Sequence, residues 1–363
     1  MKKKIILWIT ILLIAFRINA QENHLILMHP TEYNLDLFTY LVNNDIVSID
    51  NLTITGVYHT KETYDYSQSI KFIEENSYSY INLKKVSKEI TPENLYQENN
   101  CSALFQELFK NSNGILFFGG PDLPPATYNE QMHLLTKVTD PYRHYFESSF
   151  LFHLLGGSQN VSHKALLEQN PDYTVYGICL GMQTMNVATG GTMHQDIPTE
   201  IYGLNYIEDI LNLENNEQHR NYNNNLFIDS TLFSGNLHKI RITDYSSLTG
   251  DYNGNPHPLV YSNHHQAIES LGQNLVVIAT SMDHKIIEAV KHEKYSNILG
   301  IQFHPEGKYL HNPEIKYHKN PNDELKSGKE ILLGNNSYEF HLKFWKLFSK
   351  RINSDKTNTT KTL

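Results

Sequence analysis

Short apolar stretches alternate along this sequence with segments of helical periodicity, and this alternation restricts the fold more than any other feature. The apolar stretches are rich in β-branched and aromatic residues and are bounded by turn residues, which is typical of buried strands. Strands alternating with helices favour an α/β fold in which helices cover a mostly parallel sheet. We predict strands at His24–Met28, Leu52–Tyr58, Gly114–Phe118, Val175–Cys179, Leu275–Thr280, Ile286–Lys291 and Ile298–Phe303, and helices at Tyr33–Val42, Cys101–Lys110, Arg143–Leu155, Leu180–Ala188 and Tyr338–Ile352.

The chain shows no repeat and no Pro/Gly-rich linker that would divide it, so we predict one domain over residues 21–353 and a frayed tail at 354–363. Polar segments at 212–225, 249–257 and 307–329 are predicted to be surface excursions. With 40% hydrophobic residues among 363, a disordered or fibrous chain is excluded. The formal charge of -9 makes duplex nucleic acid a poor partner.

Residues 1–20 have the layout of a secretory signal peptide. Three lysines precede an apolar run at Ile5–Phe16, and Ala20 precedes a polar stretch. The run is shorter than the roughly 20 residues that a membrane-spanning helix needs. We therefore predict cleavage after Ala20 and a secreted or periplasmic mature protein without a membrane span. The sequence leaves open whether the mature protein is a homodimer.

The chain has only two cysteines, Cys101 and Cys179. An exported protein of this length with two cysteines must be stabilised by its core and not by a disulfide framework. A disulfide between the two is the alternative. We disfavour it because oxidation would destroy a thiol whose sequence surroundings indicate chemistry.

Cys179 lies in a Gly-x-Cys-x-Gly pattern between a predicted strand and a predicted helix. This pattern is that of a nucleophile elbow, in which Gly177 and Gly181 permit a tight turn that presents the nucleophile at a helix N-terminus. The positive end of the helix and its free N–H groups stabilise a thiolate there. A buried structural cysteine between incidental glycines is the alternative.

A candidate base follows the last predicted strand of the sheet, where His304 and Glu306 stand two residues apart. A cysteine nucleophile needs an imidazole whose second nitrogen is oriented by another group. His304 with Glu306 supplies both parts from one strand end. A lone histidine would more often be structural, but here a carboxylate accompanies it.

Gly119 and Gly120 directly follow another predicted strand. Glycines let the backbone approach a substrate carbonyl, so these two residues and the amide of Leu180 are predicted to form an oxyanion hole. Two glycines alone would indicate only a turn. Together with the elbow and the candidate base, they indicate a cysteine hydrolase.

At this point the sequence resembles class I glutamine amidotransferase-like hydrolases, and specifically the gamma-glutamyl-gamma-aminobutyrate hydrolase family, relatives of the folate gamma-glutamyl hydrolases. The similarity extends from about Gly114 to Glu306 and departs from the family pattern at His144, where an aspartate is usual. The matching blocks are Gly119-Gly120-Pro121-Asp122 with Pro125 and Tyr128, Asp140-Pro141-Tyr142-Arg143 with Phe146-Glu147, Asn186 to Asp196, Ser262 to Ile268, and Ile287-Glu288-Ala289.

The resemblance implies a flavodoxin-like three-layer sandwich and cleavage of a small gamma-glutamyl substrate through a thioester on Cys179. It implies that His304 acts as general base and then acid, and that Glu306 orients it. The leaving amine stays open, because the regions outside the similarity match the family weakly. Substrate-binding roles are implied for Gln183, His265 and Gln266, and for the last two a surface loop is the alternative.

Two other functions fit the same motifs. One is the glutaminase subunit of an amidotransferase, which export and the lack of a synthetase domain or P-loop disfavour. The other is a gamma-glutamyl-ligand binding protein that has lost turnover, which the intact Cys179, His304 and Glu306 disfavour, although a fold alone never proves activity.

A metal enzyme is also considered, because the chain has 19 histidines. The spacings of His257, His264, His265, His292 and His304 fit no familiar zinc set, and adjacent histidines on a strand point to opposite faces. We therefore predict no metal ligands and no other cofactor.

Overall fold

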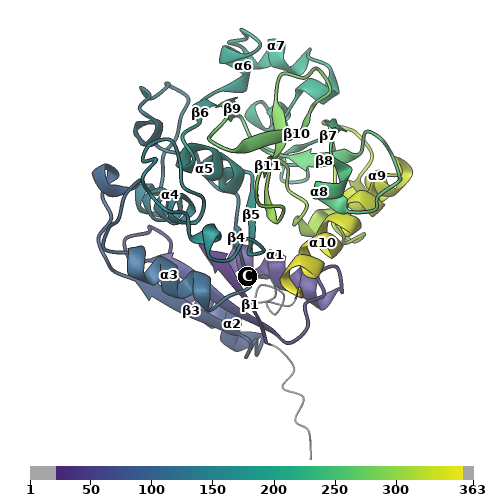
Figure 1. Ribbon diagram of the computed structural model, residues 1–363. Coiled ribbons are helices and arrows are strands. Elements are labelled where there is room, and N and C mark those ends of the chain that lie inside the picture. Colours follow the sequence, from purple (N-terminus) through teal and green to yellow (C-terminus); the bar gives the residue numbers. More distant parts are fainter. Residues whose placement is uncertain (1–21, 355–363) are drawn as a thin grey trace, which may run out of the picture.

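The computed structural model describes residues 22–354, and within that range the main sheet has ten strands in the order β3-β2-β1-β4-β5-β12-β11-β10-β7-β8. The sheet extends from the N-terminal strands, purple in Figure 1, to the green strands β7 and β8. The first six strands of this order are parallel: β3 (Ile81–Val86), β2 (Leu52–His59), β1 (Asn23–Met28), β4 (Gly114–Phe117), β5 (Thr174–Ile178) and β12 (Ile298–Ile301). The other four continue it antiparallel: β11 (Ile287–His292), β10 (Leu275–Ser281), β7 (Asn236–Ile242) and β8 (Leu259–Ser262).

Helices cover both faces of the sheet, so the architecture has three layers. One face packs against α3 (Ser102–Lys110), α4 (Pro141–Leu155) and α5 (Leu180–Ala188). The opposite face packs against α1 (Glu32–Asn43), α2 (Ser67–Glu75) and α10 (Tyr338–Ile352). The smaller elements are α6 (Ile197–Glu200), α7 (Ile207–Leu211), α8 (Tyr245–Thr249), α9 (Gly328–Gly334), the pair β6 (Thr192–His194) and β9 (Ala267–Ser270), and the pair β13 (Lys316–Tyr317) and β14 (Lys326–Ser327).

Strand β1 shows why the central strands are apolar without interruption. Ile26 and Met28 pack in the core below α3, α4 and α5, whereas Leu25 and Leu27 pack in the core below α1 and α10. Successive side chains of a strand point to opposite faces, so a strand buried on both faces needs an apolar residue at nearly every position. The predicted α/β fold with a mostly parallel sheet is confirmed.

The predicted strands and helices all occur, but some of their surroundings differ. β10 and β11 are antiparallel and extend the parallel sheet. The segment 212–225 is not only a surface excursion, because His219, Asn221 and Tyr222 are buried. The sequence analysis also missed β3, α2, β7 and β8.

None of the helices in the part of the chain that the structure describes is both long and apolar enough to cross a bilayer. The predicted signal peptide at 1–20 lies outside the described residues, as does the predicted tail after Ser354. The single domain at 21–353 stays a prediction.

Candidate active site

The predicted catalytic residues lie at one edge of the sheet. Gly119 and Gly120 follow β4, Cys179 follows β5 directly, and His304 follows β12. These three strands are neighbours and parallel, so their carboxyl ends meet. Gly119 lies so close to the other two residues that a methyl group added to its Cα would be 2.6 Å from Cε1 of His304 and 3.4 Å from Cβ of Cys179.

Cys179 has a strained backbone conformation, with φ 50° and ψ -104°. Residues other than glycine avoid positive φ, and such strain is concentrated at functional sites. The conformation is held from both sides: Cys179 N donates to Ile301 O at 2.7 Å, and Gln183 N donates to Cys179 O at 3.1 Å. The elbow therefore fixes the thiol at the first turn of α5.

The two glycines of the elbow provide clearance. A Cβ on Gly177 would lie 2.5 Å from the carbonyl carbon of Gly181, and a Cβ on Gly181 would lie 2.5 Å from the carbonyl oxygen of Phe117. Neither glycine is among the described residues with positive φ, whereas Cys179 is. The glycines thus let β5, α5 and β4 approach one another, and the strain of the turn falls on the cysteine itself.

His304 connects the thiol to a carboxylate. Its Nδ1 lies 2.7 Å from Oε1 of Glu306, and its side chain is in hydrogen-bonding contact with Cys179. A carboxylate only accepts, so Nδ1 carries a hydrogen and Nε2 is left for the thiol. Burial disfavours protonation of His304, but the negative charges of Glu306 and of the Cys179 thiolate outweigh it and hold the pKa of the imidazole well above its usual range.

The turn that carries His304 and Glu306 is anchored by the C-terminal helix. Nε1 of Trp345, a fully buried residue of α10, donates to the carbonyl oxygen of Pro305 at 3.1 Å, and Nε2 of His311 lies 2.9 Å from the same oxygen. The backbone N of His304 donates to Tyr261 O at 2.8 Å. The base is therefore positioned from both sides of its turn.

Gln302 is a residue near the thiol to which the sequence analysis gave no role. Its Nε2 donates to Sγ of Cys179 at 3.4 Å, and its Oε1 accepts from Nε2 of Gln183 at 3.3 Å. The second contact orients the amide, because it leaves the NH2 group facing the sulfur. Gln302 thus places a hydrogen-bond donor at the sulfur of Cys179.

Arg143 of α4 orients the predicted oxyanion hole. Its Nη2 donates to the carbonyl oxygens of Phe118 and Gly119, each at 3.0 Å, and its Nε is paired with Glu147 at 2.9 Å. The described residues contain no cis peptide bonds. In a trans peptide the N–H points away from the C=O, so the N–H groups of Gly119 and Gly120 face away from the guanidinium.

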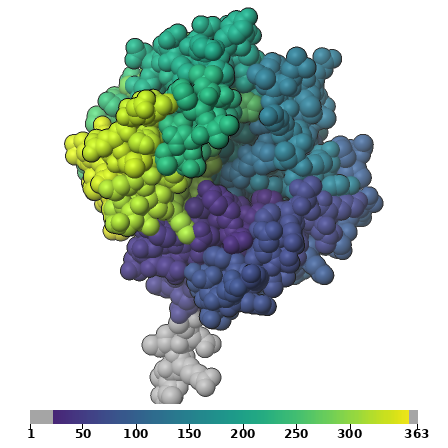
Figure 2. Space-filling model, turned by 180° about the vertical axis from the view of Figure 1, so that it is seen from behind, coloured from purple at the N-terminus to yellow at the C-terminus, as the bar shows by residue number. Residues whose placement is uncertain are grey.

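A cavity of about 390 Å³ opens beside the thiol. Of the predicted site residues, it is lined by Gly119, Gly120, Cys179, His304 and Glu306. The side chain of Leu180 is fully buried, but its backbone N–H precedes the first hydrogen bond of α5 and remains free for an oxyanion within that helix. Figure 2 shows the face of the molecule on which the purple N-terminal segments meet the green segments and the yellow C-terminal segments.

The three predicted substrate-binding residues are not among those that line this cavity. Gln183 is buried and bonded to Gln302 and to Gln266 O. Gln266 is buried and donates to Gln195 O. A role for Gln183 and Gln266 in contacting substrate stays a prediction.

His265 lies between two carboxylates. Its Nδ1 is 3.0 Å from Asp196, and its Nε2 is 3.0 Å from Asp122. Burial disfavours protonation of the ring, but the hydrogen bonds and charges of the two carboxylates outweigh it and raise the pKa of His265 to about 9. The charged ring joins the loop after β4 to the start of α6, and its predicted contact with substrate stays a prediction.

Both cysteines are free in the structure. Cys101 is fully buried at the start of α3, and burial raises the pKa of its thiol to about 11. A buried thiol of this kind is inert. The alternative of a disulfide between Cys101 and Cys179 is therefore not what the structure contains.

Comparison with known proteins places these residues in a family. Residues 56–306 match the family model described as Peptidase C26. The chain is 34% identical over 192 residues to a Mycobacterium tuberculosis protein provisionally named glutamine amidotransferase Rv2859c, covering 53% of this chain and 50% of that protein. It is 29% identical over 192 residues to the glutamine amidotransferase-like protein YvdE of Lactococcus lactis, covering 53% of this chain and 65% of that protein.

The chain thus spans between half and two thirds of the length of these curated relatives. Among solved structures, a glutamine amidotransferase from Thermotoga maritima aligns over 92% of this chain and 100% of that chain, at 11% identity and a TM-score of 0.41. Since the family model covers more than half of the sequence, the protein belongs to the peptidase C26 family of class I glutamine amidotransferase-like proteins.

Proposed function

We propose that the protein is a cysteine hydrolase that cleaves gamma-glutamyl amide bonds through a thioester on Cys179. The observation that carries the proposal is the strained cysteine at the start of α5, in contact with an imidazole whose Nδ1 is 2.7 Å from a carboxylate. Nucleophile, base and orienting group are thus within reach of one another.

The first half of the reaction forms the thioester. The Cys179 thiolate attacks the gamma-carbonyl carbon, and the negative charge that develops on the carbonyl oxygen is received by the N–H groups of Leu180 and of Gly119 or Gly120. The C–N bond then breaks, and the nitrogen leaves as an amine with the proton from Nε2 of His304. Glu306 keeps the imidazole oriented throughout this step.

The second half restores the enzyme. Water attacks the thioester carbonyl while Nε2 of His304 accepts one of its protons. The C–S bond breaks, glutamate is released, and the proton on His304 again faces the Cys179 thiolate. The amine and glutamate are the only products, and no cofactor takes part.

A second cavity, of about 500 Å³, adjoins the first and supports a proposal for the leaving group. Residues that line both cavities include Tyr33, Tyr261 and Tyr309, and the second cavity adds Phe233 and Tyr317. We propose that it receives the amine side of the substrate, with aromatic rings as its walls.

The charges of the second cavity disfavour an anionic leaving group. Among the described residues that line it, Lys308 is the cation, and its Nζ is already 2.5 Å from Asp36. Asp229 adds a further negative charge. A carboxylate at the end of the leaving amine, as in gamma-glutamyl-aminobutyrate, would therefore be unpaired there.

We expect the mature protein to prefer a gamma-glutamyl amide of benzylamine over one of 4-aminobutyrate by about tenfold or more in kcat/KM, since the ring is buried among aromatic residues and the carboxylate finds no counter-ion. Both substrates carry a primary alkyl amine, so the bond that breaks is alike. Release of glutamate measures the turnover. Tyr317→Ala should reduce the preference and leave hydrolysis of glutamine, which lacks an extended leaving group, nearly unchanged.

Other outcomes of the same panel would favour the alternative functions. Fastest turnover of free glutamine, with release of ammonia, would support a glutaminase subunit like the amidotransferases in the names of its relatives. Binding of gamma-glutamyl amides without any turnover would support a silent binding protein. Equal rates for the benzylamide and the aminobutyrate amide would contradict an aromatic leaving-group cavity.

Export is part of the proposal, on the basis of residues 1–20. We expect the protein recovered from outside the cytoplasm of its host to begin at Gln21, because Ala20 ends the predicted signal peptide. Mass spectrometry of the intact protein and of its N-terminal peptide measures this. A protein that retains Met1 and stays in the cytoplasm would contradict export.

A further inference from the structure

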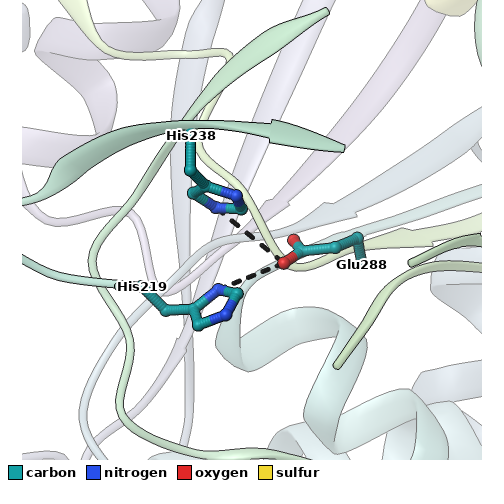
Figure 3. A group of neighbouring side chains, drawn as sticks. All are labelled: His219, His238 and Glu288. Atoms are coloured by element: carbon teal, nitrogen blue, oxygen red, sulfur yellow. Dashed lines mark ion pairs between the residues drawn. The ribbon is translucent and has the colours of Figure 1, made fainter. Parts of the chain in front are cut away.

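Three buried side chains from distant parts of the sequence converge outside the active-site cavity. His219 lies between two short 3-10 turns, His238 lies on β7, and Glu288 lies on β11. Their ligand atoms lie within 4.8 Å of one another, and their side chains are at most 1% exposed. Figure 3 shows both imidazoles directed at the same carboxylate.

The distances fit a metal ion better than hydrogen bonds. Oε1 of Glu288 is 3.2 Å from Nδ1 of His219 and 3.8 Å from Nε2 of His238. However, neither oxygen of Glu288 and neither nitrogen of His219 has a hydrogen-bond partner. In a tetrahedral zinc site with ligand distances of about 2.0–2.1 Å, neighbouring ligand atoms are about 3.3 Å apart. One distance lies close to that edge and the other is about 0.5 Å longer, and all three ligand atoms lie within 4.8 Å of one another, so a bound ion would draw them together.

The hydrogen bonds of His238 leave the correct nitrogen available. Its Nδ1 is 3.2 Å from the carbonyl oxygen of Lys239, which only accepts, so Nδ1 carries the hydrogen and Nε2 keeps its lone pair. A backbone carbonyl on the far nitrogen is the usual support for a metal-binding imidazole. In the structure the lone pair of Nε2 accepts from the hydroxyl of Ser262 at 2.8 Å, a donor that is free to rotate away.

A third imidazole packs against the cluster and provides an independent observation. The rings of His264 and His219 are 5.0 Å apart, and Nδ1 of His264 is 2.8 Å from Gln266 O. The other nitrogen, Nε2, therefore has a lone pair, and it is buried without a partner. An unpaired polar atom inside a protein costs about 1–3 kcal/mol, so several of them in one place indicate a missing ligand.

Without a cation, the cluster buries the carboxylate of Glu288 without a positive counter-ion. The side chains of all three residues are at most 1% exposed, so solvent water does not screen the carboxylate of Glu288. Among the described residues, no lysine or arginine is paired with Glu288. Neutral imidazoles and a carboxylate are the protonation states in which these side chains bind metals.

We propose that His219, His238 and Glu288 bind one divalent transition-metal ion, zinc foremost, with water as the fourth ligand. Two histidines and one carboxylate are a recognised zinc set. None of the three residues lines the cavity at Cys179, so the proposed ion takes no part in the attack of the thiol on the substrate. It would join the 212–225 segment to β7 and β11, in the antiparallel half of the sheet.

The proposal departs from the sequence-based prediction that the chain has no metal ligands. The sequence analysis considered the spacing of other histidines, because zinc-binding motifs place pairs of ligands a few residues apart. Here the ligands come from one loop and two non-adjacent strands of the sheet, and only the fold brings them together.

The test uses the full chain with Cys179→Ala, which removes the active-site thiol as a second place for zinc. Since the cluster is buried, zinc is supplied during expression, and the protein is purified without chelators. We expect about one equivalent of zinc by elemental mass spectrometry, falling to about a tenth or less in Glu288→Gln and His238→Gln. Cobalt supplied in place of zinc should give the visible absorption of a tetrahedral site.

His341→Gln is the matched control, because His341 is equally buried but lies outside the cluster. It should retain the full zinc content, and its thermal midpoint, like that of the parent, should fall when a chelator is present during refolding. Glu288→Gln keeps the shape of the side chain, and its midpoint should not respond to the chelator. Absence of zinc from the parent, or equal zinc in Glu288→Gln, would overturn the proposal.

Discussion

Replacing Cys179 by alanine should abolish the release of glutamate from gamma-glutamyl amides, with a loss of about 10⁴-fold or more in kcat. In the proposed mechanism the thiol sulfur forms the bond to the substrate in the first step, and Cys179 is the one thiol among the described residues that line the cavity. Cys179→Ser should be almost as impaired, because a hydroxyl is far less acidic than a thiol. Assay of the purified variants for released glutamate measures the loss.

Cys101→Ala is the control for Cys179→Ala, because it removes the other buried thiol, which lies at the start of α3. It should lower stability modestly and leave kcat unchanged. With a slow substrate, mass spectrometry of the trapped wild-type protein should find the glutamyl adduct on Cys179. Undiminished turnover by Cys179→Ala, or an adduct on Cys101, would refute the thioester mechanism.

Removing the imidazole in His304→Ala should cost about 10³-fold or more in kcat/KM, whereas Glu306→Gln should cost less, about 10–100-fold. In the proposed mechanism His304 exchanges the proton with the thiol and the leaving amine, but Glu306 acts only through His304, at 2.7 Å from its Nδ1. The glutamine amide of the variant can still bond to Nδ1. It orients the ring without the negative charge.

The pH profile of kcat/KM distinguishes two effects of Glu306: orienting the ring of His304 and supplying a negative charge beside it. Burial opposes protonation of His304, and the charges of Glu306 and Cys179 together raise its pKa well above the usual range. The imidazolium that protonates the leaving amine is therefore present in the wild type up to a pH well above 6.5, the usual histidine pKa, and is lost as the pH rises through the raised pKa. In Glu306→Gln the pKa falls, so the alkaline limb of kcat/KM should move to lower pH. An unmoved limb, or a loss equal to that of His304→Ala, would contradict this role.

The strands that could be predicted from the sequence are those buried on both faces. Ile115 to Phe118 and Val175 to Ile178 are fully enclosed and read as continuous apolar runs. β3 was missed because it lies at the edge of the sheet and contains Lys84 and Lys85. α2 was missed because it is only nine residues long and its apolar residues Phe72 and Ile73 are only partly buried against the core.

Prediction of which residues lie together was possible where a residue's place depends on its own strand end. Cys179 and His304 both follow strands of the parallel sheet, and parallel strands bring their carboxyl ends together. It was incomplete where the direction of a side chain decides the contact. The hydrogen bonds from Arg143 to two carbonyls and from Gln302 to the sulfur depend on rotamers, and no spacing in the sequence reports them.

The hydrogen bond from Trp345 to the carbonyl oxygen of Pro305 makes the order in which the chain is synthesised relevant to activity. The thiol, its elbow and the glycine turn belong to the first half of the chain, but the turn that carries the imidazole is secured by a helix made more than thirty residues after it. In a polypeptide still attached to the ribosome, Cys179 would be present before α10 holds the turn that carries His304. In the proposed mechanism, His304 would thus be held in position only once Tyr338–Ile352 has been made and has folded onto the turn.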